Sequence, residues 1–177
     1  MNVHRRTTVQ SLVTAWLLAL GLIDFGTSST TLSFFNKGEL VLLRQFEFGS
    51  GEVLKQVETT LHVDTDTAQG ILADSAFDIS ELLRESLSPV ANQLVVSRDF
   101  VERREDCSIS SLHAIGGIAL SKAAMGELEQ ALSVDIKQWD PFAGLVMAPQ
   151  AMDEALRPQR WRFGAAIGAA LAALEEA

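Results

Sequence analysis

The alternation of apolar and polar residues predicts a sheet at the start of the chain. Three apolar stretches of strand length follow one another closely, over 20–24, 30–35 and 39–48. Small hydroxyl residues separate the first two stretches, and the hairpin turn sequence Asn36-Lys37-Gly38 separates the second from the third. We therefore expect three antiparallel strands, ended by the glycines of Gly49-Ser50-Gly51.

Beyond residue 51 the apolar positions change to helical spacing. Helices are expected over 52–61, from the capping cluster at 64–67 to residue 75, from Asp78 to a charged loop at 102–106, over 121–132 and over 161–174. Pro89 is expected to kink the long helix that Asp78 begins. Strands are expected over 110–115 and 134–138. This order indicates an α/β fold with a mixed sheet and flanking helices, as in a ribonuclease-H-like layer.

The first nineteen residues resemble a signal peptide, because a basic start precedes the apolar stretch 12–23. That stretch is shorter than the roughly 20 apolar residues that a membrane-spanning helix needs, and it runs directly into the first predicted strand. Export is therefore the less favoured alternative, and direct membrane insertion is not expected. We expect a helical lead-in over 1–19 and a single lobe over 20–177, with a small helical insertion at about 52–77.

Composition and charge narrow the possible functions. The chain has 177 residues, enough for one domain with a substantial core. Its formal net charge of -9 opposes binding to DNA or RNA, which requires basic surface. A nuclease of the ribonuclease-H-like class would hold two metals with several carboxylates, and only Asp24 stands at a suitable strand end. The single cysteine, Cys107, excludes an intramolecular disulfide.

The turn between the first two strands carries the clearest chemistry. Asp24 and Gly26 end one apolar run, and Thr27, Ser28 and Thr30 lead into the next. Glycine lets the backbone approach an anion, while turn amides and hydroxyls face it. These five residues are candidate phosphate ligands, and Asp24 is the candidate ligand of Mg²⁺ through a water molecule. The structural alternative is a strand-end acid and hydroxyls that satisfy the turn itself.

Four segments together resemble the PilM family of type IV pilus assembly proteins, which belongs to the actin-like ATPase superfamily. The segment 23–31 is similar to the family's second phosphate motif, 38–49 to its following strand, 113–120 to its adenosine motif and 163–171 to its last helix. The cytoplasmic region of GspL proteins from type II secretion is a related match. The resemblance implies the second lobe of an actin-like ATPase.

The resemblance also implies partners and a cofactor. It implies a cytoplasmic scaffold or adaptor for pilus or secretion assembly, held at the inner membrane by a PilN-like protein or another assembly component. It implies Mg-ATP as the ligand, with adenosine beside Gly116, Gly117 and Ile118. The two glycines have an equally good structural explanation as a turn between a strand and a helix. An exposed lobe face would favour homodimers.

Two departures from the family pattern bear on activity. About twenty residues precede the phosphate hairpin, fewer than the roughly 50 that a separate lobe requires. The stretch 67–72 lacks the acid and the lysine that relatives direct at the nucleoside. We therefore expect one lobe with a partial or degenerate nucleotide site and no catalysis on its own. The alternatives are an ATPase or phosphotransferase that needs a first lobe, and a remnant that folds but binds nothing.

Overall fold

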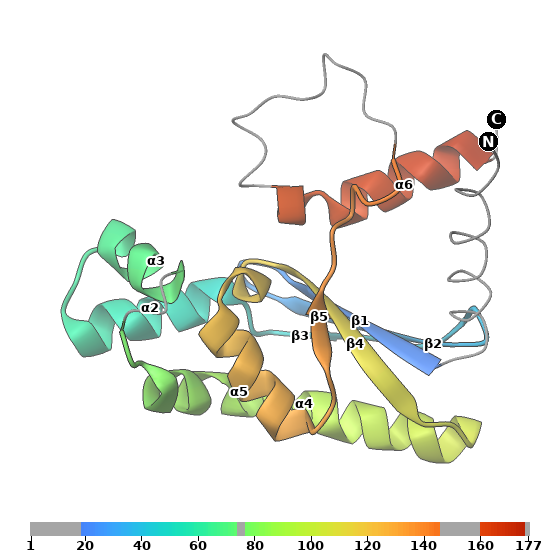
Figure 1. Cartoon of the computed structure of the whole chain (residues 1–177), viewed down its shortest axis with the longest axis horizontal. Helices are drawn as coiled ribbons and strands as arrows, with labels where there is room; N and C mark the ends of the chain where they lie inside the picture. Colours follow the sequence, from blue (N-terminus) through green and yellow to red (C-terminus); the bar gives the residue numbers. More distant parts are fainter. Residues whose placement is uncertain (1–18, 74–76, 146–159, 176–177) are drawn as a thin grey trace, which may run out of the picture.

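The computed structural model of the chain describes residues 19–73, 77–145 and 160–175, and these form a five-stranded sheet with helices on both faces (Figure 1). The strand order is β3-β2-β1-β4-β5. The expected lead-in over 1–19 lies outside the described residues except for its last residue. The α/β class and the mixed sheet are as predicted.

The strands closely follow the predicted ranges. They are β1 (Ala19–Phe25), β2 (Thr30–Asn36), β3 (Glu39–Phe46), β4 (Ile109–Gly116) and β5 (Ile136–Gln138). The first three pair antiparallel, whereas β4 runs parallel to both β1 and β5. Their lengths and order confirm the predicted antiparallel start followed by alternating strands and helices.

The helices surround this sheet. They are α2 (Ser50–Leu61), α3 (Thr65–Ala73), α4 (Ser80–Glu105), the short 3₁₀ helix η1 (Ile118–Leu120), α5 (Lys122–Leu132) and α6 (Gly164–Glu175). Helices α4 and α5 cover one face of the sheet and α6 lies over the other, while α2 and α3 project beyond the sheet's end (Figure 1). No helix in the described ranges has both the length and the apolar character that a membrane span requires.

The predicted charged loop at 102–106 is wrong, because α4 continues to Glu105. Val101 is buried, so the last turns of the helix still pack on the core. The Glu102 carboxylate accepts a hydrogen bond from the Ile109 amide at 2.8 Å, which ties the helix end to the start of β4. The charged residues at 102–105 therefore belong to the last turn of α4. The helix also continues through Pro89 without a break.

The core lies between the sheet and the pair α4 and α5. Every second residue of β1 is buried on that face, which is the alternation expected of a sheet with one packed side. The largest fully buried side chains of the core include Ile23, Phe25, Leu32, Phe34, Leu87, Leu94, Leu112 and Leu128. Residues on the opposite face, such as Asp24 and His113, are only half-buried beneath α6.

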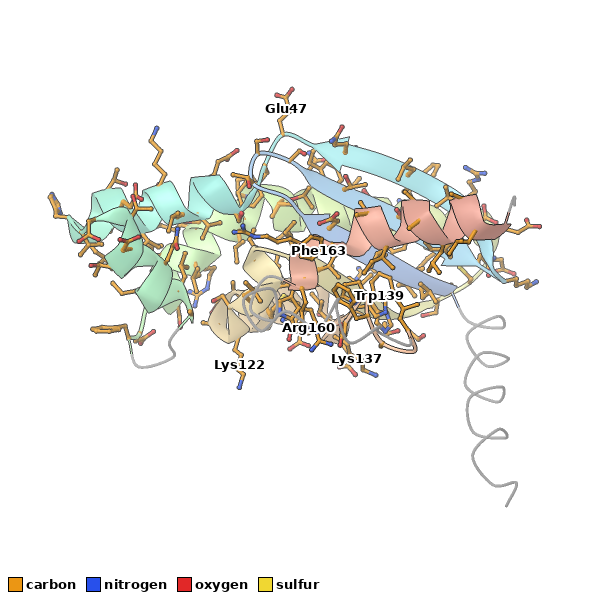
Figure 2. The ribbon with its side chains drawn as sticks, turned by 90° about the horizontal axis from the view of Figure 1, so that it is seen from above. Glu47, Lys122, Lys137, Trp139, Arg160 and Phe163 are labelled. Atoms are coloured by element: carbon orange, nitrogen blue, oxygen red, sulfur yellow. The ribbon has the colours of Figure 1, made fainter. Side chains whose placement is uncertain are left out.

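An ion pair and an aromatic contact join the segment after β5 to the segment that leads into α6. The Arg160 guanidinium forms two hydrogen bonds to the Asp140 carboxylate, one of them from Nε to Oδ1 at 3.1 Å. The Phe142 and Phe163 rings pack edge to face at 6.2 Å. Figure 2 shows Arg160 and Phe163 close to Trp139 at this end of the sheet. These two contacts fix where α6 begins.

Candidate functional site

Three turns that contain glycine meet at one end of the sheet. They are the β1–β2 turn at 26–29, the start of α2 at 49–51, and the Gly116-Gly117 turn that follows β4. Phe25 and Gly116 are partners in the parallel pairing of β1 with β4, so two of the turns begin side by side. We call these segments the three-turn cluster.

Hydrogen bonds fasten the other two turns to the β1–β2 turn. The Ser50 amide donates to the Gly26 carbonyl at 2.9 Å, and the Ser50 hydroxyl donates to the same oxygen at 3.1 Å. The Gly51 amide donates to the Thr27 carbonyl at 2.9 Å, and the Gly117 amide donates to the Phe25 carbonyl at 2.9 Å. The first amides of α2 therefore face protein carbonyls, whereas such amides at other helix starts often bind anions.

The glycines of the cluster allow the turns to approach one another. A Cβ added to Gly49 would collide with the Thr27 carbonyl, and one added to Gly117 would lie 2.7 Å from the Ser50 Cβ and Oγ atoms. Gly116 has φ +90°, and a Cβ there would strike the Phe25 carbonyl. In this structure these glycines make room for neighbouring backbone and for Ser50.

The exposed end of the β1–β2 turn offers free donors. Thr27 and Ser28 are exposed, and within the described part of the chain neither backbone amide has a hydrogen-bond partner. The Gly26 amide is already bonded to the Ser29 carbonyl at 3.0 Å. Two amides and two hydroxyls are thus available to an anion at this point.

Thr30 has a different position from the one that a phosphate ligand requires. Its side chain is fully buried, and its hydroxyl donates to the Phe48 carbonyl at 2.8 Å. It lies on the same face of β2 as Leu32 and Phe34, toward the core. The geometry gives Thr30 a structural role in holding the segment between β3 and α2.

Asp24 is half-buried on the face of β1 that lies toward α6. Its neighbours across the strands are Thr31 and Ile115. Burial raises the pKa of the Asp24 carboxyl above its ordinary value. Among the described residues no donor bonds to this carboxylate, and no group of three or more acidic, histidine or cysteine side chains is placed to hold a metal. A bound Mg²⁺ would therefore need phosphate oxygens and water beside Asp24.

The candidate adenosine residues also differ in what they present. Gly117 is half-buried and leaves backbone accessible, whereas Gly116 is buried. The Ile118 side chain is 4% exposed and packs in the core, so it is turned away from any ligand in this region. Gln138 donates through Nε2 to the Ala119 carbonyl at 3.1 Å, which holds η1 against the end of β5.

Sequence reasoning treated Gly49-Ser50-Gly51 only as a break in the sheet and missed its contact with the hairpin. The signal was present in the two glycines that flank a serine at a helix start.

A family model described as "Type IV pilus assembly protein PilM" matches residues 9–174. This chain belongs to the PilM family.

Solved structures agree with the family on the fold. A chain of a structure described as "PilM-PilN type IV pilus biogenesis complex" superposes with a TM-score of 0.72 at 19% identity, and the match covers 92% of this chain and 48% of that one. The archaeal actin homologue Ta0583 gives a TM-score of 0.62 at 15% identity, covering 96% and 53%. MreB5 of Spiroplasma citri bound to ADP gives a TM-score of 0.52 at 13% identity, and the match covers 69% of this chain and 49% of that one.

This PilM-family chain spans about half the length of the solved structures that it matches. The comparisons confirm the predicted actin-like fold and the predicted family. No curated protein has a significantly similar sequence.

Proposed function

We propose that this PilM-family chain is a non-catalytic scaffold or adaptor in type IV pilus assembly. The observation that carries the proposal is the Ser50–Gly26 contact, in which the amide and the hydroxyl at the start of α2 both bond to one carbonyl of the hairpin. Donors that a phosphate would otherwise attract are thereby occupied by protein. The family match to type IV pilus assembly supplies the setting.

The partner we propose is a PilN-like protein, because this chain shares its fold with a chain of the PilM-PilN complex. Such a partner would hold the chain at the cytoplasmic side of the inner membrane. Related components of pilus assembly or of type II secretion are the other candidate partners. Scaffolding requires a stable fold and an accessible surface, and it requires no reacting group.

The residues that remain free fit a limited role in nucleotide binding. Thr27 and Ser28 would hold phosphate through their amides and hydroxyls, Asp24 would hold Mg²⁺ through water, and the Gly117 backbone would lie beside the nucleoside. Bound Mg-ATP would supply a transferable phosphoryl group. The segments of the three-turn cluster, 26–29, 49–51 and 116–117, contain no acid or histidine to orient an attacking water. We therefore expect the site to be partial and the isolated chain to be inactive.

The second candidate is an ATPase or phosphotransferase completed by a first lobe in trans. The Asp24 carboxylate and the amides of Thr27 and Ser28, which have no partner among the described residues, favour it, because these groups are suited to metal and phosphate. This candidate predicts Mg-ATP turnover when a PilM first lobe is added.

Two measurements test the scaffold proposal. In isothermal titration calorimetry with the cytoplasmic segment of a PilN-like protein from the same genome, saturable binding supports an adaptor, and no heat above that of a scrambled segment contradicts it. In thermal unfolding with Mg-ATP, a ligand at 100 times its Kd stabilises a protein by about 2.7 kcal/mol. We expect little or no such shift. A shift that is lost in Asp24→Ala but kept in the exposed control Asp135→Ala would favour the ATPase candidate.

A further inference from the structure

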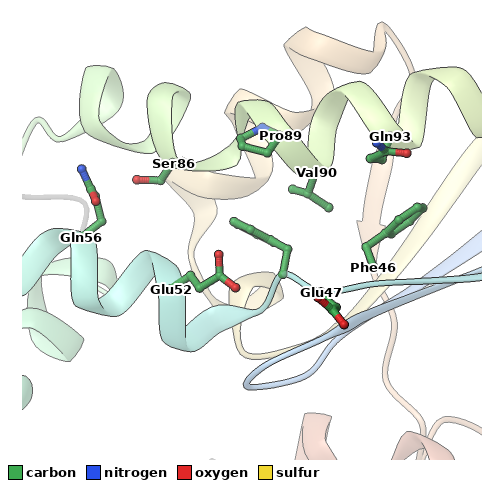
Figure 3. Close-up of a pocket in the computed structure, with 9 residues that line it drawn as sticks. Phe46, Glu47, Glu52, Gln56, Ser86, Pro89, Val90 and Gln93 are labelled. Carbon is green, nitrogen blue, oxygen red and sulfur yellow. The ribbon is translucent and has the colours of Figure 1, made fainter.

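A groove of about 430 Å³ opens at the outer edge of the sheet, where β3 ends and α2 passes α4 (Figure 3). Phe46 and Val90 supply apolar surface, and the polar lining includes Glu47, Glu52, Gln56 and Gln93. The lining residues come from β3, from the segment that follows it, and from the facing sides of the two helices. We call it the α2–α4 groove.

The charged side chains that line the groove are acidic, and one cation lies at its rim, where the Arg44 guanidinium is 5.1 Å from the centre of the Phe46 ring and donates to Gln93 Oε1 at 3.4 Å. The groove lining contains two carboxylates and no lysine, arginine or histidine. Both glutamates are exposed, and neither forms an ion pair with any residue in the described part of the chain. The Gln56 carboxamide adds a further acceptor, whereas Gln93 Oε1 already accepts from Arg44 Nη2. An apolar surface rimmed by acceptors is complementary to a Lys or Arg side chain, whose stem is apolar and whose head donates hydrogen bonds.

The groove continues into an unpaired strand edge. β3 is the last strand of the sheet on its side, and no other described strand pairs with its outer edge. Alternate residues of such a strand point N–H and C=O groups outward, where an added strand can pair with them. Leu40 and Leu43 are 53% and 61% exposed on this strand, and Phe46 belongs both to β3 and to the groove.

We propose that the β3 edge and the α2–α4 groove together bind an extended segment of a partner protein that alternates apolar and basic residues. The segment pairs with β3 by strand addition, its apolar side chains lie beside Leu40 and Leu43, and one Lys or Arg enters the groove between Glu47 and Glu52. A second copy of this chain is disfavoured as the occupant, because its own β3 begins at Glu39 and is followed by Glu47, and its net charge is -9.

Binding at this surface requires neither nucleotide nor a PilN-like partner. This proposal is therefore independent of the proposed function. It also explains two features that the fold alone leaves open, namely exposed leucines on an edge strand and, beside aromatic surface, glutamates that form no ion pair with the described residues. Exposed apolar edges usually invite aggregation, and a dedicated strand partner would cover this one.

Fluorescence anisotropy on the full chain, with a fluorescein-labelled Thr-Val-Arg-Val-Thr-Val peptide as the probe, tests this proposal. We expect saturable binding that weakens by about tenfold or more in Glu47→Gln/Glu52→Gln, since the arginine loses its charge-assisted hydrogen bonds. Glu85→Gln, an exposed change on α4 outside the groove lining, should leave the affinity unchanged. Circular dichroism checks that each variant folds.

Two further probes separate strand addition from simple charge attraction. The same peptide with alternate amides N-methylated keeps its charge but cannot pair with β3, and we expect it not to bind. The peptide with glutamate in place of arginine should also fail. Hydrogen exchange of the β3 amides should slow when the parent peptide binds. Equal binding of all three peptides, no binding of the parent, or an unchanged affinity in the double variant would overturn the proposal.

Discussion

The Gly26 carbonyl accepts two hydrogen bonds from Ser50, one from its amide at 2.9 Å and one from its hydroxyl at 3.1 Å. The two residues are 24 positions apart, so this contact joins the β1–β2 turn to the start of α2. It fixes the hairpin from one side while the Gly117 amide holds it from the other. The hairpin is therefore part of a larger, bonded unit.

Removing the Ser50 hydroxyl should loosen this unit. We expect Ser50→Ala to lower the free energy of unfolding by about 1 kcal/mol, because one partly buried hydrogen bond is lost while the amide bond remains. Urea unfolding followed by circular dichroism measures the effect. Ser28→Ala, at an exposed position of the same cluster, is the control and should unfold like the parent. Equal effects of the two changes would contradict the importance of the contact.

Gly117 and Ser50 should be coupled in a double-mutant cycle. A Cβ on Gly117 would lie 2.7 Å from the Ser50 side chain, so Gly117→Ala should lower the free energy of unfolding by about 1–3 kcal/mol. Ser50→Gly removes the obstructing atoms, and the double variant should lose less than the sum of the two single losses. Strict additivity in urea unfolding would show that the two residues do not compete for space.

Thr30 should matter for stability and not for ligand binding. Thr30→Val keeps the shape but leaves the Phe48 carbonyl without its 2.8 Å donor, which we expect to lower the free energy of unfolding by about 1–3 kcal/mol. Thr30→Ser keeps the hydroxyl and separates loss of the bond from loss of a methyl group. If Thr30→Val instead unfolds like the parent but abolishes a phosphate or nucleotide signal, the sequence-based assignment of Thr30 as a ligand would be restored.

The Asp24 carboxylate should make the folded protein less stable than it could be. Burial raises its folded pKa above the ordinary 3.8, so the ionised form is disfavoured in the fold at neutral pH. Asp24→Asn should therefore raise Tm at neutral pH. The gain should shrink as pH falls through the raised pKa and vanish below 3.8, where both states bind the proton. Thermal unfolding across this range, with Asp135→Asn as the exposed control, measures the difference.

His113 should give stability a dependence on pH in the opposite direction. Burial, followed by the nearby charge of Lys137, lowers its folded pKa below the ordinary 6.5. The unfolded chain then binds a proton before the folded one does, so stability is complete above 6.5 and declines as pH falls below it. His113→Gln should reduce the decline between that value and the lowered folded pKa, and Lys137→Gln should reduce it less. An unchanged slope in His113→Gln, measured by urea unfolding, would assign the dependence to other groups.

The sequence predicts the local parts of this fold well. The β1–β2–β3 meander follows directly from strand alternation and from Asn36-Lys37-Gly38, because hairpin register depends on neighbouring residues. The end of α4 was missed because a run of charges looks like a loop until Val101 is seen to be buried. A helix that covers a sheet keeps charges on its solvent side for as long as the sheet lasts.

The candidate site also contains parts that local sequence predicts and parts that it does not. Asp24 and the β1–β2 turn were found because they are contiguous, whereas the role of Ser50 depends on a contact between distant segments that no local pattern encodes. A sequence signal for the buried position of Thr30 was also available. Thr30 has the same parity as Leu32 and Phe34 in β2, and the two-residue period of a strand places all three toward the core.

The packing of Gly117 against Ser50 has a consequence for how this part of the molecule can change over evolutionary time. Three short sequence segments, far apart along the chain, share one small volume, and each leaves space that another fills. A bulkier residue in one segment is tolerated only after a neighbouring segment has become smaller. Substitutions there should consequently arise in compensating pairs across family members, and covariation between position 50 and position 117 would record this shared space.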